Sequence, residues 1–203
     1  MSGALAWTLV ALGLLVLVAR RRSVAVALVT SQALVLVGVA LYDATSGGEI
    51  VAAGALGVRA VALAALFLVL VARTRESRPV RARVNPLMRA GGAVAFALTL
   101  TWLVPTIGLA SRDAERAVLA LVAFGIATVA TRRATLFHVL GIVLVENALA
   151  LSALELPGGA SIVIELGVAF DLILVALVAA VFHERIFAEF GAGDSAALRT
   201  LRD

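Results

Sequence analysis

Four ionisable residues interrupt long apolar stretches of the sequence, where a charge would lie within a lipid bilayer. They are Arg59, Glu146, Glu165 and Asp171. A charge in hydrocarbon is costly, so such residues usually face the protein interior or a water-filled cavity and mark functional sites. Carboxyl groups in such a place can bind and release protons, and a nearby arginine influences which form they take. The sequence therefore predicts proton-handling chemistry inside a membrane.

Three of these residues are predicted to share one depth. At ~1.5 Å per residue, Glu146, Asp171 and Arg59 each lie ~18 to 20 Å from the predicted cytoplasmic end of their apolar stretch. The short turn at Pro157-Gly158-Gly159 makes the last two stretches antiparallel neighbours, so Glu146 is expected within side-chain or one-water distance of Asp171. Two carboxyls that close do not easily both ionise, so one can keep a proton. Movement of Arg59 toward or away from them would then switch their proton affinity.

Other interpretations stay open for individual residues. Arg59 and one acid also fit a fixed ion pair that holds helices together. Glu165 lies near the outer end of its stretch and fits a wetted interfacial residue equally well. His138, eight residues before Glu146, can pass protons toward the cytoplasm, although a structural histidine is the commoner case.

Uncharged polar and small residues predict helix packing instead of chemistry. Gln32 and Asn147 are candidates for hydrogen bonds between helices. Gly54, Gly57 and Gly167 are expected where helices approach closely.

Composition excludes most other classes of protein. Of 203 residues, 63% are apolar and only 15% are charged, which does not suffice to cover a water-soluble fold. The absence of cysteine excludes disulfides, thiolate metal sites and iron-sulfur clusters, and two histidines exclude a three-His zinc site. No phosphate-binding glycine loop or hydrolase motif occurs. We therefore expect no cofactor, no metal and no catalytic residue in this chain.

Seven apolar stretches have about the length that a bilayer requires. The predicted fold is an all-α, polytopic transmembrane helix bundle that forms one integral membrane domain over residues 1–203. The stretches are 3–19, 24–42, 51–72, 91–109, 115–131, 134–154 and 161–183.

The arginines predict the orientation. All 17 basic residues are arginine, and fourteen of them fall in connections on one side of the predicted spans, which should be the cytoplasmic side. They flank membrane spans, so nucleic-acid binding is not expected. We expect a cytoplasmic (inner) membrane protein with its N-terminus outside, a cytoplasmic C-terminus and a retained first helix. The connection 73–90 is predicted to be an irregular linker that faces the headgroups.

A constant offset of 111 residues aligns the first three spans with the last three. It places Arg21-Arg22 on Arg132-Arg133, and Gly47-Gly48 on Gly158-Gly159. This pattern predicts two parallel repeats, with function where the copies differ. Chance alignment of Ala/Val/Leu-rich hairpins is the alternative. The predicted parts are the first repeat 1–72, the linker and connector helix 73–114, and the second repeat with its tail 115–203.

These motifs resemble a known family. Residues 132–133, 140–151, 166–171 and 194–199 are similar to the K-type small subunit of respiratory complex I. Over its whole length the chain resembles the hydrogenase-4 component E family, an extended relative of that subunit. Asp171 matches the second buried acid of the K-type pattern, whereas Val143 stands where the first acid is typical.

The resemblance implies a small non-catalytic membrane-arm subunit of a complex I-related oxidoreductase complex, of hydrogenase-4 or formate hydrogenlyase type. Its implied role is proton translocation or coupling. The implied partners are antiporter-like and other membrane-arm subunits, together with lipid. Two alternatives from the residues stay open: an independent small transporter in which Arg59 binds an anion, and an assembly scaffold whose charges form ion pairs.

Overall fold

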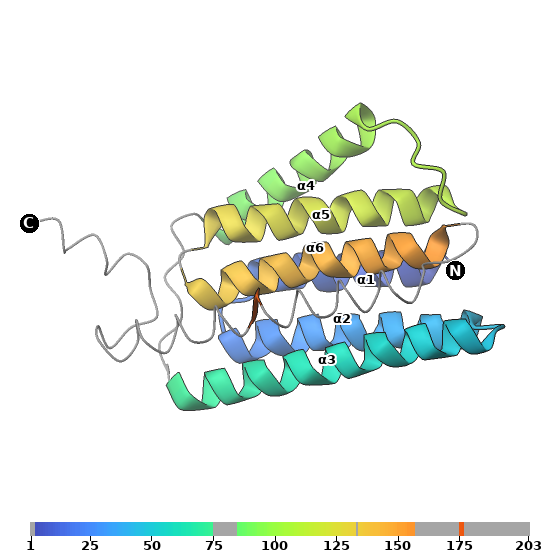
Figure 1. The fold of residues 1–203 in the computed structure, drawn as a ribbon. Helices are drawn as coiled ribbons and strands as arrows, with labels where there is room; N and C mark the ends of the chain where they lie inside the picture. The colour runs from blue at the N-terminus through green and yellow to red at the C-terminus, as the bar shows by residue number, and fades with distance from the viewer. Residues whose placement is uncertain (1–2, 75–84, 133, 157–174, 177–203) are drawn as a thin grey trace, which may run out of the picture.

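The described part of the chain is helical. The computed structural model describes residues 3–74, 85–132, 134–156 and 175–176, and these form six α-helices (Figure 1). The all-α class predicted from the sequence is confirmed, while the predicted span 161–183 lies outside the described residues apart from 175–176. The helices are α1 (Gly3–Val18), α2 (Arg22–Asp43), α3 (Gly47–Thr74), α4 (Pro86–Leu103), α5 (Arg112–Thr131) and α6 (Thr135–Glu155).

Most of the described helices have the length and composition of membrane spans. Five of them, α2 to α6, are long and apolar enough to cross a bilayer, which takes about 20 apolar residues. α1 is also apolar, with 16 residues. The protein is therefore a multi-pass membrane protein.

The helices run side by side and alternate in direction (Figure 1). One end of the bundle thus collects the last turns of α1, α3 and α5 with the first turns of α2, α4 and α6. We call it the arginine-rich end, because Arg21, Arg22, Arg89 and Arg132 lie there. At the opposite end lie all but one of the described carboxylates. These are Asp43, Glu49, Asp113, Glu115 and Glu155.

The fourth helix is displaced from its predicted span, 91–109. It begins at Pro86, because the Asn85 side chain accepts a hydrogen bond from the Leu87 N–H (3.0 Å) and proline suits the first helical position. It ends at Leu103, shortly before Pro105, whose ring disfavours helical backbone in the preceding residue. Arg89, which the sequence assigns to the linker, therefore lies inside a helix.

Two glycines let α5 and α6 pack backbone against backbone. A Cβ atom on Gly125 would lie 2.6 Å from the carbonyl oxygen of Gly141, and one on Gly141 would lie 2.8 Å from that of Gly125. Close approach was expected at Gly54 and Gly57 instead. Among the described residues, a Cβ atom on Gly54 would meet no atom within 4 Å and one on Gly57 would make only an ordinary contact, so neither glycine makes an unusually tight contact there.

The apolar core is divided along the bundle. Toward the arginine-rich end, one cluster joins α2, α3 and α6 through Val29, Leu63 and Val143. Toward the opposite end, a small cluster joins α2 and α3 through residues such as Ala40 and Leu56. Between them, α2, α3 and α6 each contribute a buried polar side chain, so the helix bundle holds a polar layer about midway along its length.

Candidate functional site

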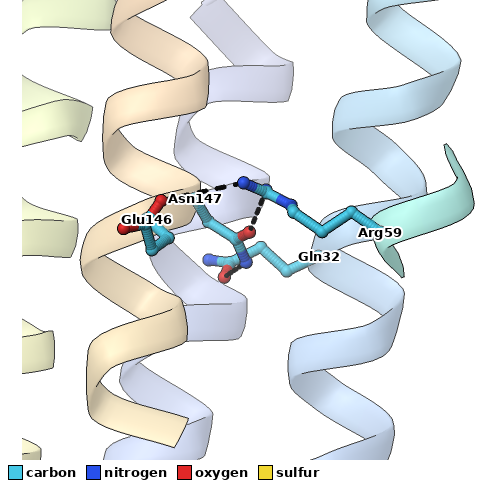
Figure 2. A network of polar contacts seen from close by, with 4 residues as sticks. All are labelled: Gln32, Arg59, Glu146 and Asn147. Carbon is cyan, nitrogen blue, oxygen red and sulfur yellow. Dashed lines mark hydrogen bonds and ion pairs between the residues drawn. The ribbon is translucent and has the colours of Figure 1, made fainter. Parts of the chain in front are cut away.

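The polar layer centres on Arg59. Its Nη1 lies 3.8 Å from Oε2 of Glu146, and its Nη2 donates a hydrogen bond of 3.4 Å to Oδ1 of Asn147. Arg59 reaches from α3 toward α6, where both partners sit on adjacent positions (Figure 2). Only 4% of the Arg59 side chain and 20% of the Glu146 side chain are exposed. A cation and an anion thus meet inside the bundle, away from water.

Amide groups extend the layer to the remaining inner helices. Asn147 Nδ2 donates a hydrogen bond of 2.8 Å to Oε1 of Gln32 on α2, and Gln32 Nε2 donates one of 2.8 Å to the backbone oxygen of Leu9 on α1. Both amide side chains are fully buried. The sequence-based prediction that Gln32 and Asn147 bond helices together is confirmed. Gly13 lies beside Gln32 Nε2, where a Cβ atom would approach to 3.5 Å.

Each charged residue of the layer lies near the middle of its helix. Arg59 is 12 residues from the start of α3, and Glu146 is 11 residues from the start of α6, or ~16 to 18 Å along the axis from opposite ends of the bundle. The 3.8 Å contact between the two side chains confirms the common depth predicted for Arg59 and Glu146. A charge at this depth is far from bulk water, so each partner stabilises the other strongly.

A narrow crevice leads to the layer. It runs between α2, α3 and α6, and among its lining residues are Thr30, Ala64, Phe67, Arg59 and Asn147. The space is about that of one water molecule. A single water there would contact the guanidinium and the amide, whereas a larger solute would not fit without movement of the helices.

The chemistry available to the layer follows from its groups. Glu146 is the ionisable acid of the described layer, and Asn147 and Gln32 exchange only hydrogen bonds. Proton uptake by Glu146 would remove the negative charge that faces Arg59, so protonation and the position of the guanidinium would be linked.

The other predicted residues are not part of the described layer. Asp171 and Glu165 lie outside the described residues. His138 is half-buried in the first turn of α6, ~12 Å along the axis from Glu146, and no hydrogen bond among the described residues joins it to that carboxylate.

A second polar cluster, which was not predicted from the sequence, lies at the arginine-rich end. Arg132 is 3% exposed. Its Nη2 donates hydrogen bonds to the backbone oxygens of Leu17 (2.9 Å) and Ala19, and its guanidinium lies over the Phe137 ring, 4.1 Å from the centroid. Burial, and then the positive charge of Arg89, lowers the pKa of Arg132 to about 10, so it remains protonated at neutral pH.

The spacing of residues along α5 indicates that Arg132 is buried. Arg132 follows Thr128 by four residues and Gly125 by seven, so it continues the buried face of α5. From the sequence, Arg132 was used only to predict the membrane orientation, but its side chain points into the bundle.

The comparisons with known proteins show one similarity. The chain is similar to a protein of Mycobacterium tuberculosis (strain ATCC 25618 / H37Rv) named Uncharacterized protein Rv0085, at 29% identity over 161 residues, covering 73% of this chain and 72% of that protein. No family model matches the chain, and no solved structure matches it. The similarity extends well beyond the length of any one helix.

Proposed function

We propose that this chain is a small, non-catalytic membrane subunit that contributes to proton translocation or coupling through buried carboxylates. The observation that carries the proposal is the Arg59–Glu146 pair, 3.8 Å apart and midway along an apolar helix bundle. An ion pair at this depth is costly to maintain, and intramembrane acids commonly form proton relays. The Asn147 and Gln32 amides bind Arg59 and each other, and a crevice with space for about one water reaches Arg59 and Asn147.

In this proposal Glu146 alternates between two states. The ionised carboxylate pairs with Arg59. Protonation makes it neutral and weakens its hold on the guanidinium, and release of the proton restores the pair. Asp171, which the sequence places at the same depth, is the proposed second proton acceptor, with Glu165 and His138 as proposed steps toward the two surfaces.

The proposal includes a larger complex in which this chain is one membrane subunit. The resemblance to hydrogenase-4 component E supports a place in the membrane arm of a complex I-related oxidoreductase complex, beside antiporter-like subunits. The architecture we propose has seven spans, two parallel three-helix repeats and a connector helix, in the cytoplasmic membrane with the C-terminus inside. The apolar surface of α3 and α4 fits this role, since lipid or partner helices can cover it.

The geometry favours this function over an independent transporter with an anion site at Arg59. An anionic substrate would have to displace Glu146 from the guanidinium, and the crevice beside Arg59 holds about one water. Reconstitution of the isolated chain in vesicles distinguishes the subunit from the independent transporter. We expect no solute flux from the chain alone, and substrate-driven flux would contradict the proposal.

The direct test uses the full chain in its native membrane. An affinity-tagged chain should copurify with antiporter-like and redox subunits identified by mass spectrometry. Glu146→Gln should leave that copurification intact and abolish most proton translocation by membrane vesicles containing the complex. Asp43→Asn, an exposed acid at the end of α2, is the matched control and should have no effect. Normal proton translocation in Glu146→Gln would refute the role of this carboxylate.

A further inference from the structure

Two buried arginines at the arginine-rich end have unused hydrogen-bond donors. Arg89 is 3% exposed, and none of its three side-chain nitrogens has a hydrogen-bond partner among the described residues. Arg132 is equally buried, and its Nε and Nη1 also have no hydrogen-bond partner in that part of the chain. An uncompensated buried charge is strongly unfavourable, so these donors require an acceptor that the described residues do not provide.

Both side chains belong to one junction of helices. Arg89 continues the buried stripe of α4 formed with Ala93 and Ala97, and these two alanines pack in one cluster with α1 and α5. Arg132 directly follows α5 and donates to the last carbonyls of α1. In Figure 1, α4 lies nearest to α5 at this end and diverges from it toward the other. The two guanidiniums therefore meet where the start of α4 adjoins the ends of α1 and α5.

No described acid neutralises this junction. Five of the six described carboxylates lie at the opposite end of the bundle, and the sixth, Glu146, is at the middle beside Arg59. The two arginines also repel one another, which is one cause of the lowered pKa of Arg132. Within the described part of the chain, the junction thus holds two buried guanidiniums and no acid.

We infer that Arg89 and Arg132 bind a phosphate group at this junction. A planar guanidinium can hold two phosphate oxygens side by side, and Arg89 has all its nitrogens available for such contacts. The backbone carbonyls of α1 and the Phe137 ring hold Arg132 in position before any ligand arrives. This inference stands independently of the proton-handling function.

The start of α4 offers a path for such a group. Leu87 and Met88 on the first turn are 80% and 71% exposed, which places this turn at the surface of the bundle. Gly92, three residues after Arg89, has open space where a Cβ atom would stand. A phosphate can approach Arg89 past this glycine, either as the headgroup of an anionic lipid or as a free ion.

The test compares the two sources on the full-length protein. Protein in a neutral detergent is titrated with phosphatidylglycerol, with phosphatidylcholine and with inorganic phosphate, and binding is followed by native mass spectrometry and by thermal unfolding. Retention of phosphatidylglycerol alone assigns the lipid headgroup as the source. Stabilisation by inorganic phosphate as well assigns a site open to the free ion. Binding of neither overturns the inference.

Three variants locate the site. Arg89→Gln should weaken phosphatidylglycerol binding about tenfold, because it removes charged hydrogen bonds. Arg21→Gln, an exposed arginine at the same end, is the matched control and should change binding by about twofold or less. Arg132→Gln should resemble Arg89→Gln. Arg132→Gln also loses contacts with α1, which can prevent folding. In that case Arg89→Gln alone is the test. If folded Arg89→Gln binds phosphatidylglycerol with wild-type affinity, the inference is overturned.

Discussion

The polar layer and the arginine-rich end both bury arginine side chains, but they balance the charge in different ways. Midway along the bundle, Arg59 meets the Glu146 carboxylate and the Asn147 amide. At the arginine-rich end, Arg132 contacts backbone carbonyls and an aromatic ring, and Arg89 has no hydrogen-bond partner within the residues that the structure describes. Deep in hydrocarbon the compensating charge has to come from the protein, whereas at headgroup depth an external anion is within reach.

Removing the internal counter-charge should have the largest effect. Glu146→Leu leaves Arg59 buried without this carboxylate and should destabilise the fold by about 3 to 5 kcal/mol. The double variant Arg59→Met/Glu146→Leu should recover much of that loss, since a buried ion pair replaced by apolar groups is often neutral. Unfolding titrations with a denaturing detergent measure both. The single variants Arg59→Met and Glu146→Leu give the reference. If the double variant loses as much stability as these two lose together, the two charges act independently.

Packing between α5 and α6 supports both regions, because α6 carries Glu146 and Asn147 while Arg132 follows α5. Gly125→Ala places a methyl group 2.6 Å from a backbone oxygen and should destabilise by about 1 to 3 kcal/mol. Gly54→Ala, in open space on α3, is the control and should be neutral or slightly stabilising. Equal effects of the two variants in thermal unfolding would contradict backbone contact between α5 and α6.

The third prediction concerns the contribution of the Gln32–Asn147 hydrogen bond to the stability of the polar layer. Gln32→Leu leaves the Asn147 Nδ2 donor without its 2.8 Å acceptor and should cost about 1 to 3 kcal/mol. Combining Gln32→Leu with Asn147→Leu gives a double-mutant cycle, and the coupling energy should be about 1 kcal/mol. Purely additive losses would mean that the hydrogen bond contributes little to stability.

The sequence predicted the all-α class of the fold, because the apolar stretches have the length of membrane helices. It also predicted the common depth of Arg59 and Glu146, because depth follows from counting residues along a helix. It also predicted Gln32 and Asn147 as a hydrogen-bonding pair, since buried amides in membrane helices need partners. It did not predict Gly125 and Gly141 as the close contact, because glycine type alone does not tell which helix face meets a neighbour. It assigned Arg89 to a linker, because the Asn85 cap that starts α4 earlier was overlooked.

The smallest effect, with the opposite sign, is expected at the arginine-rich end. In neutral detergent without phosphate, Arg89→Met removes a buried charge that has no hydrogen-bond partner, so it should raise stability by about 1 kcal/mol. Arg59→Met, the matched change at the polar layer, should lower stability, because it removes the cation that faces Glu146 at 3.8 Å. Thermal unfolding of the two variants in the same detergent makes the comparison. A loss of stability in both would mean that Arg89 is balanced within the chain itself, and the distinction between internal and external compensation would no longer hold.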